Sequence, residues 1–502
     1  MEFAFYFQTL FTFFFMFMVI KVLRGSKTPP NLPPGPRKLP IIGNILDVVG
    51  PFPHHTLRDL AQKYGPLMHL QLGENSTIIA SSAETAKEVM KTNDINFANR
   101  PFLLAAHIIS YKSTNIMFSP YGDYWRQLRR ICNSELLSAK HVQSLGPIRE
   151  EEVSHLITTI SKHSGSPINL SEHIYALTYG ILTRSVFGKK LKQQEALISL
   201  INEALGISGG FSLTDLYPSS KLVAFLSGLR PKLEKIHERF DVMLDDIIEE
   251  HKAQQVGKGK VDVNHHLLFD VLLKLQEHGN LELPLTMDNI KAIILDIISA
   301  GSDTSSTVIE WAMSELLKNP EIMDKAQNEV RKAFSTKTTV DESGIQSLEF
   351  LKLIIKETLR LHPPAPLMLP MENREKCEIN GYEIPVRTKV IVNVWAIGRD
   401  PKYWKDPERF HPERFLNSSI DYRGLDFEYI PFGSGRRICP GISFGLANLE
   451  LPLASLLYHF DWKLADSSRM NQDLDMTEAF GVTVKRKTFL NLIPTLRYPP
   501  VY

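Results

Sequence analysis

The chain has 502 residues, of which 43% are hydrophobic and 23% are charged. This composition is globular, and the length is enough to enclose a large cofactor in about one to three domains. With 57 basic and 56 acidic residues the net charge is +1, so no bulk field would recruit nucleic acid or an acidic substrate. Three scattered cysteines, Cys132, Cys377 and Cys439, are too few for a disulfide framework and favour a reducing compartment.

The first twenty residues, MEFAFYFQTLFTFFFMFMVI, are mostly apolar and aromatic, and they precede Lys21, Arg24 and Lys27. A stretch of about 20 such residues can span a bilayer. A cleaved signal peptide is the alternative, but the positive n-region and the small-x-small cleavage site of such peptides are missing. We therefore expect residues 1–20 to be a transmembrane signal anchor, and the basic flank predicts that the body of the protein stays cytosolic.

Residues 21–40 are basic and rich in proline, and the run PPNLPPGP is typical of a stiff, extended linker. Two segments after it, LMHLQLG and STIIAS, predict short strands. From residue 84 to about residue 330, apolar residues recur at three- and four-residue spacing, which predicts a helix-rich body. Three later segments, CEINGYEIP, TKVIVNVWAI and FLNLIPTL, predict further strands.

A polar stretch that starts near Gln254 is predicted to be a loop, and it contains the pair His265 and His266. Adjacent histidines on a loop can bind a metal, but they are more often solvated. We see no internal repeat and no clean domain border. The working prediction for residues 41–502 is one large, mainly α-helical domain with a minor amount of β-sheet.

The stretch FEYIPFGSGRRICPGISFG, residues 427–445, places Cys439 among glycines and arginines. The Lys-Ser/Thr of a Walker loop and the third glycine of a dinucleotide fingerprint are both missing. Pro440 predicts a helix start beside the thiol, where free amides and neighbouring arginines would favour a thiolate. No second cysteine or nearby histidine completes a zinc set, so a metal at this thiolate would take its other ligands from a cofactor, as haem iron does. A buried, inert cysteine is the alternative.

Five residues fit the pattern F-x-x-G-x-R-x-C-x-G, namely Phe432, Gly435, Arg437, Cys439 and Gly441. This pattern resembles the haem-binding loop of the cytochrome P-450 superfamily. Three further motifs of that family occur earlier in the chain, in the order expected for it. The resemblance covers nearly the whole chain. It implies the P-450 fold enclosing haem b, with Cys439 as the axial ligand of the iron and the other four residues in the haem-binding loop.

The first further motif is AGSDTSS, in which Ala300 and Thr304 lie four positions apart and share a helix face. Thr304 can donate to the carbonyl of Ala300 while Asp303 faces solvent, or the acid and the alcohol can pass protons into a gap beside the helix. In the family that this motif resembles, the acid–alcohol pair lies over the haem and delivers protons to bound oxygen. The resemblance therefore implies that Asp303 and Thr304 are catalytic.

The motif KETLRLHPP carries Glu357 and Arg360 three positions apart on one predicted helix. By resemblance they form a buried structural triad with Arg414 of FHPERF. In YWRQLRR, Trp125 and Arg129 lie four positions apart and form either an amphipathic surface pair or, by resemblance, contacts to the haem propionates together with Arg437. Similar plant enzymes usually carry an arginine where this chain has Met371, so a further propionate contact is in doubt.

The resemblance is strongest to plant microsomal enzymes, above all to those that oxidise terpenoids. It implies a monooxygenase of the endoplasmic reticulum membrane, with a single span and a cytosolic catalytic domain, that uses O2 and receives NADPH electrons through a separate cytochrome P-450 reductase. The expected substrate is apolar, a sesquiterpene or a diterpene. By resemblance the pocket residues are Phe102, Ile293, Ile297, Ala300, Ala365, Leu369, Phe480 and Val482, each of which could instead be ordinary core packing.

Two other classes share part of this pattern. A haem-thiolate isomerase or lyase would work without O2 or a reductase, but such enzymes tend to lack the acid–alcohol pair. A membrane-tethered binding protein would need no thiolate at all. The sequence leaves open which carbon is oxidised, how many oxidations follow, and whether the apolar segment KLVAFLSGL, residues 221–229, touches the membrane.

Overall fold

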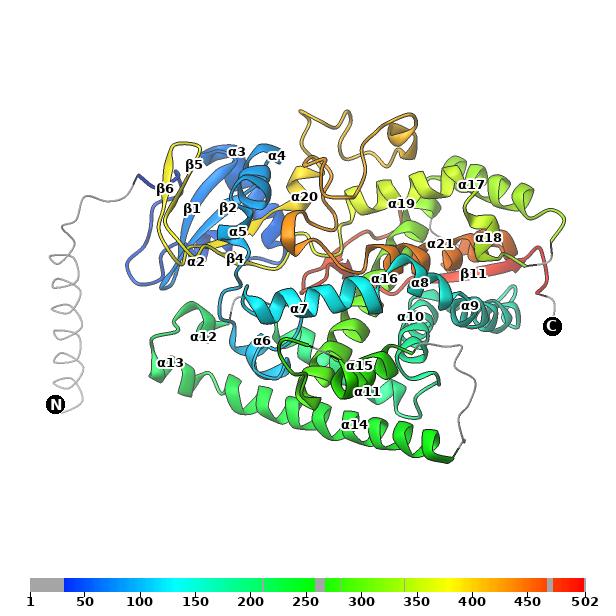
Figure 1. Cartoon of the computed structure of the whole chain (residues 1–502). Helices are drawn as coiled ribbons and strands as arrows, with labels where there is room; N and C mark the ends of the chain where they lie inside the picture. Colours follow the sequence, from blue (N-terminus) through cyan, green and yellow to red (C-terminus); the bar gives the residue numbers. More distant parts are fainter. Residues whose placement is uncertain are drawn as a thin grey trace, which may run out of the picture.

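The computed structural model describes residues 31–209, 212–257, 267–279, 281–337, 339–466 and 473–500. The predicted anchor at residues 1–20, the first half of the predicted linker and the histidines at 265 and 266 lie outside these described residues. Figure 1 shows a β-sheet region on one side of the molecule and a larger body of helices on the other, with helix α16 passing through the middle.

The largest sheet has four strands in the order β1-β2-β7-β4, and it confirms the two strands predicted after the linker. These strands are β1 (Leu67–Leu72), β2 (Asn75–Ala80), β7 (Lys389–Val392) and β4 (Met371–Glu372). Strands β1 and β2 form an antiparallel hairpin whose turn contains Gly73 at a φ of +61°, a conformation that favours glycine. Strand β7 then pairs with β2 in parallel.

Three smaller sheets complete the β structure. They are β3-β11-β8 (Ile168–Asn169, Asn491–Leu496 and Phe460–Leu464), β5-β6 (Cys377–Ile379 and Tyr382–Ile384) and β9-β10 (Glu478–Ala479 and Lys485–Arg486). The predicted strand TKVIVNVWAI was only half right, because a short helix, α20 (Val394–Ile397), follows β7 directly. The Asn393 side chain accepts a hydrogen bond from the Ala396 amide at 3.1 Å and so caps that helix.

Helices make up most of the remaining described chain, as predicted. Those longer than eight residues are α3 (Pro53–Tyr64), α7 (Asp123–Ile131), α9 (Gly146–Ser161), α10 (Leu170–Phe187), α11 (Gln194–Ile207), α14 (Leu229–Gly257), α15 (Leu268–His278), α16 (Met287–Lys318), α17 (Pro320–Ala333), α19 (Glu349–Leu361) and α21 (Ile442–His459). The shorter ones include α2 (Ile45–Val48), α4 (Ala83–Lys87), α6 (Leu104–Ile109), α12 (Leu213–Leu216) and α13 (Lys221–Leu226). The loop predicted from Gln254 begins later than expected, because α14 continues to Gly257.

Helix α16 is the central element of the fold. A capping box between Thr286 and Asn289 starts it, and Pro320 prevents it from continuing much beyond Lys318. It packs against α10, α19 and α21, and among the described residues it is the one helix long and apolar enough to cross a membrane. Most of it is buried inside the protein, which identifies it as the core helix of this domain.

Candidate functional site

The loop around Cys439 is shaped by glycines and lies directly before helix α21. Gly433 and Gly435 have φ values of +75° and +69°. A Cβ at Gly435 would lie 2.3 Å from the carbonyl oxygen of Met90, so this close backbone approach requires glycine. The Cys439 amide donates to the Phe432 carbonyl at 2.9 Å, which closes the loop. The helix begins at Ile442 with Gly441 as its N-cap, so Pro440 lies two residues before the first helical position, near the helix start as predicted.

The thiol of Cys439 is partly buried, and we infer an internal space beside it. Its side chain keeps accessible surface, yet burial raises the pKa of the thiol, while the backbone at Gly441 and the charge of Arg129 act in the opposite direction. A thiolate at this position therefore needs additional positive charge, which a bound metal cation would supply. Cys132 is different, because it is fully packed in the core and its pKa is raised to about 12.

Three arginines lie near this space without a carboxylate partner among the described residues. Arg437 donates to the carbonyls of Ala98 and Ser119, both at 2.7 Å. Arg100 donates to the carbonyls of Met117, Leu369 and Pro370, each at 2.9 Å. These three arginines are Arg100, Arg129 and Arg437, and burial together with their mutual repulsion lowers the pKa of Arg437 to about 8. A half-buried cationic cluster of this kind fits a ligand that carries carboxylates.

The predicted aromatic partner of this cluster, Trp125, is buried and not on the surface. The Arg437 guanidinium lies 4.2 Å from the centre of the Trp125 ring. The indole N–H donates to the Ile116 carbonyl at 3.1 Å, and Arg129 follows one turn later on α7. The alternative of an amphipathic surface pair is therefore wrong for Trp125. Met371 is buried in β4, and the side chain of Arg374 is exposed on the surface.

The motif AGSDTSS includes the stretch of helix α16 that is not fully buried by neighbouring elements. Between Asn289 and Leu317, every residue of the helix is buried except Ser299, Ala300, Gly301 and Thr304. This short stretch therefore borders an internal space. The Thr304 hydroxyl donates to the Ala300 carbonyl at 2.6 Å, as the simpler alternative anticipated. Asp303 is 1% exposed and does not face solvent.

The carboxylate of Asp303 is held by the C-terminal hairpin β9-β10. The Thr483 hydroxyl donates to one carboxylate oxygen, and Lys485 forms an ion pair with the other. Neither partner was predicted from the sequence, because both lie about 180 positions from Asp303 along the chain. The buried carboxylate of Asp303 therefore belongs to a polar network with an alcohol and an ammonium group.

Glu357, Arg360 and Arg414 form one buried ion-pair cluster. Arg360 makes a two-point contact with the Glu357 carboxylate at 2.7 and 2.8 Å, and Arg414 donates to it at 2.9 Å. Arg360 also donates to the carbonyls of Gly398 and Pro407. The cluster ties helix α19 to the segment 398–414 that leads toward the cysteine loop, which is a scaffold role.

A largely apolar cavity lies between α6, α11, α16, β7 and the β9-β10 hairpin. Of the predicted pocket residues, Leu369, Phe480 and Val482 line it. Phe102, Ile293, Ile297, Ala300 and Ala365 do not line it. Phe102 is 58% exposed on the surface, while Ile293 and Ile297 are packed in the core. The face of α16 that lines the cavity comprises Ala292, Leu295, Asp296 and Ser299, about one residue away from the predicted face.

The residues around Cys439 fit a haem group. Cys439 offers a sulfur ligand, and Arg100, Arg129 and Arg437 are half-buried cations without a carboxylate partner among the described residues. Arg100 was missed from the sequence because no local spacing connects it to the cysteine loop. A single arginine outside any motif does not indicate a binding role in the sequence. Its guanidinium is recognised only once the fold places it against the carbonyls of residues 117, 369 and 370.

Comparisons with known proteins agree with this geometry. A sequence model of the Cytochrome P-450 family matches residues 33–491. The chain is 53% identical to premnaspirodiene oxygenase from Hyoscyamus muticus, with 97% of both chains covered. It is 52% identical to germacrene A hydroxylase from Barnadesia spinosa, with 96% of both chains covered. A zebrafish cytochrome P-450 structure with abiraterone shares the fold at a TM-score of 0.75 and 24% identity, covering 90% of this chain and 100% of that one.

Proposed function

We propose that this chain, which belongs to the cytochrome P-450 family, hydroxylates a terpenoid. It is a haem-dependent monooxygenase that works with a redox partner, O2 and a hydrophobic substrate. One oxygen atom of O2 enters a C–H bond of the substrate. The other leaves as water, which takes up two protons and two electrons. The isomerase or lyase alternative is disfavoured, because the relatives compared above are an oxygenase and a hydroxylase.

The observation that carries the proposal is the partly buried thiol of Cys439, whose nearby charges include the half-buried Arg129. Cys439 would provide the thiolate ligand of the haem iron. Haem bound there supplies the redox-active iron, and a thiolate ligand favours cleavage of the O–O bond. Arg100, Arg129 and Arg437 would bind the haem propionates, and Trp125 would support Arg437 by stacking. Gly435 allows the close approach of the loop to the Met90 backbone, and Gly441 is the N-cap of helix α21.

Asp303 and Thr304 are assigned to proton delivery. Thr304 is the half-buried hydroxyl on the uncovered stretch of α16, so it can donate a proton into the internal space. Asp303 cannot reach bulk water directly, and its partners Thr483 and Lys485 provide the route by which its proton is exchanged. The two residues therefore have separate tasks: Thr304 donates at the site, and Asp303 resupplies protons from the hairpin side.

The substrate class follows from the cavity and from the relatives. The cavity walls carry leucine, isoleucine, alanine, phenylalanine and methionine side chains, which match a hydrocarbon skeleton. Premnaspirodiene and germacrene A, named in two relatives, are terpenes. A sesquiterpene or a diterpene is therefore the proposed substrate of this chain.

The proposed electron donor is an NADPH-dependent cytochrome P-450 reductase at the endoplasmic reticulum membrane. A surface with exposed apolar side chains supports a membrane location: no residue of α13 is buried, and Phe225 is 81% exposed. Its neighbours Leu222 and Leu226 are also exposed. With the anchor expected at residues 1–20, we propose a single span and a cytosolic catalytic domain.

Turnover of a terpene panel under labelled O2, with reductase and NADPH, tests the function. Product that carries one label supports it, and turnover without NADPH or without label contradicts it. The ligand assignment is tested separately by the carbon monoxide difference spectrum of Cys439→Ser. We expect loss of the thiolate-type band in Cys439→Ser and its retention in the control Cys377→Ser, because Cys377 lies on β5, away from the haem-binding loop.

A further inference from the structure

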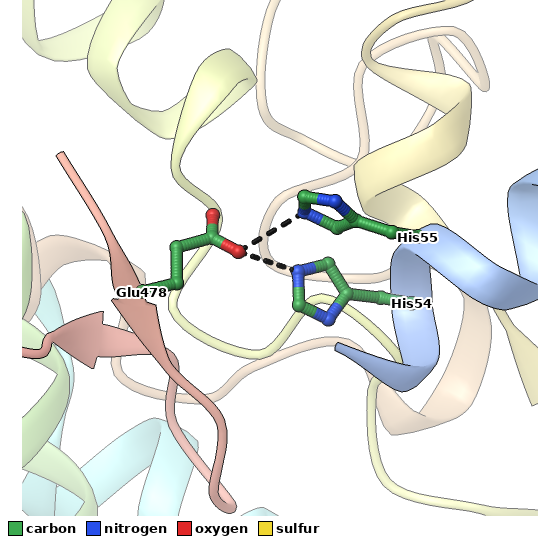
Figure 2. Close-up of side chains that lie close together, drawn as sticks. All are labelled: His54, His55 and Glu478. Atoms are coloured by element: carbon green, nitrogen blue, oxygen red, sulfur yellow. Dashed lines mark hydrogen bonds and ion pairs between the residues drawn. The ribbon is translucent and has the colours of Figure 1, made fainter. Parts of the chain in front are cut away.

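The hairpin β9-β10 is fastened at its first strand by a three-residue cluster. Figure 2 shows Glu478 reaching from the hairpin toward two adjacent histidines on the first turn of α3. One carboxylate oxygen accepts hydrogen bonds from His54 Nε2 at 2.8 Å and His55 Nε2 at 3.1 Å. His54 is fully buried, and Glu478 is nearly so. The cluster therefore joins the N-terminal and C-terminal parts of the described chain.

The same three side chains are close enough to hold a metal ion, but their surroundings favour an ion pair. Both imidazoles share a single carboxylate oxygen at hydrogen-bond distance. The Nδ1 atom of His54 has no hydrogen-bond partner among the described residues, although histidine ligands of metals usually donate a second hydrogen bond. Arg58 and Arg399 lie over the nearby Trp395 ring and would repel a dication. The histidines and the start of α3 instead stabilise the carboxylate, and they hold the pKa of Glu478 well below its usual range.

The histidines are themselves held firmly. The His55 ring stacks on Trp395 with ring centres 4.0 Å apart, and the Asn393 side chain donates to the His54 carbonyl at 2.8 Å. The His54 ring also stacks on Phe480, with ring centres 5.8 Å apart and planes inclined by 17°. Glu478 and Phe480 thus contact the same buried ring, so the position of Phe480 depends on that ring.

Phe480, Gly481 and Val482 form the part of the hairpin that lines the apolar cavity. Beyond them, the Val484 amide donates to the Pro364 carbonyl at 2.9 Å. The Trp311 indole donates to the Val484 carbonyl at 3.1 Å. The wall residues 480–482 are therefore held in place at both ends, by the contacts of Glu478 before them and by those of Thr483 to Lys485 after them. Loss of the Glu478 attachment would free one side of the wall only.

We propose that the His54–Glu478 pair positions the Phe480–Val482 wall and thereby determines which carbon of the substrate is oxidised. This inference rests on the proposed monooxygenase function, because the wall can select a carbon only if the cavity holds the substrate. Glu478 is a positioning residue in this scheme, since it contacts neither the substrate nor the cofactor. It acts through the placement of Phe480.

The experiment compares Glu478→Ala and Glu478→Gln with the wild-type protein. Glutamine keeps one acceptor oxygen for the histidines but no charge, so it should restore part of the attachment. Glu383→Ala is the matched control, because Glu383 lies on the other hairpin, β5-β6, and pairs with Lys376 at 2.9 Å away from the cavity. The readouts are the ratio of regioisomeric products, the carbon monoxide spectrum, the zinc content and the hydrogen exchange of residues 479–484.

We expect Glu478→Ala to exchange faster at residues 479–484 and to change the product ratio by about tenfold, because small displacements of a bound substrate have large effects on rate. The carbon monoxide spectrum of Glu478→Ala should stay that of the wild type. The exchange rate and product ratio of Glu478→Gln should lie between those of the wild type and Glu478→Ala, and those of Glu383→Ala should match the wild type. Unchanged exchange would overturn the proposal, as would faster exchange with an unchanged product ratio. If the wild-type protein contains one zinc ion per chain and Glu478→Ala loses it, the cluster is a metal site and the proposal is wrong.

The exchange measurement needs no substrate, so it tests the attachment even if no terpene is turned over. Absence of terpene turnover by the wild-type protein would contradict the proposed substrate class, and the product ratio would then be measured on whichever other apolar compound gives a spin shift. If Glu478→Ala fails to incorporate haem, Glu478→Gln provides the same comparison with a smaller expected change.

Discussion

Lys485 forms an ion pair with the buried carboxylate of Asp303, so the acid beside the internal space is tied to the C-terminal hairpin. We expect Lys485→Met to lower the amount of product formed per NADPH consumed, because the carboxylate would lose its cation and keep only Thr483 as a partner. The decrease should be about threefold to tenfold, smaller than the 10²- to 10⁴-fold typical for loss of the acid itself. Parallel assays of NADPH, peroxide and product provide the measurement.

Lys487→Met is the control for that prediction. Lys487 is exposed and lies two residues after Lys485, so the two variants lose the same charge from the same segment. Equal product yields in Lys485→Met and the wild type would show that the ion pair has no part in proton delivery.

Thr304→Ala should uncouple the reaction. The Thr304 hydroxyl lies on the stretch of α16 that is not fully buried. Without this hydroxyl, protons resupplied by Asp303 have no side chain that passes them into the internal space. NADPH should still be consumed, with peroxide released in place of product, and Thr304→Ser should restore coupling. The control is Thr307→Ala, since the Thr307 hydroxyl donates to the Asp303 carbonyl in the buried part of the same helix. Full coupling in Thr304→Ala would contradict the assignment.

Asp296 should make stability depend on pH. Burial raises the pKa of Asp296 to about 7, although its carboxylate accepts hydrogen bonds from Asn115 at 2.6 Å and from the Met117 amide at 3.2 Å. Between the ordinary carboxyl pKa and about 7, the folded state therefore binds more protons than the unfolded state, and stability falls as pH rises through this range. The unfolding midpoint should decrease from pH 5 to pH 7.5 in the wild type and less so in Asp296→Asn. Identical slopes would contradict this account.

Removal of Glu357 should destabilise the protein strongly. Glu357→Ala leaves Arg360 without its buried counter-ion, which costs about 3–5 kcal/mol for pairs of this kind. Low expression and reduced haem content are the expected results. Glu413→Ala is the matched control, because the exposed pair of Glu413 with Lys325 contributes only about 0–1 kcal/mol. A protein as stable as the wild type after loss of Glu357 would show that the cluster is not a scaffold.

The sequence predicted those parts of the site that lie close together along the chain. The loop from Phe432 to Gly441 is such a case, because its turn glycines, Gly433 and Gly435, lie within the motif itself. The strands β1 and β2 were also predictable, since alternating apolar residues flank a glycine turn. The short helix α20 was missed because its apolar residues continue the pattern of β7 without a break, and only the Asn393 side chain marks the change.

Contacts between distant segments could not be predicted. No sequence pattern singled out Thr483 or Lys485, and only the fold placed them against Asp303. The cavity face of α16 was predicted about one residue away from its observed position, because an all-round apolar helix gives no periodic signal to orient it. Thus Ile293 and Ile297 were chosen where Ala292 and Asp296 line the cavity.

The contact between His54 and Glu478 joins residues 424 positions apart, and this separation has a consequence for biosynthesis. A ribosome adds about 5–20 residues per second, so the first turn of α3 emerges tens of seconds before its partner is made. Throughout that interval the His54 imidazole has no carboxylate partner, and the cavity lacks the wall formed by Phe480–Val482. Chains that end before residue 478 would retain Cys439 but lack the residues that close the cavity on the C-terminal side.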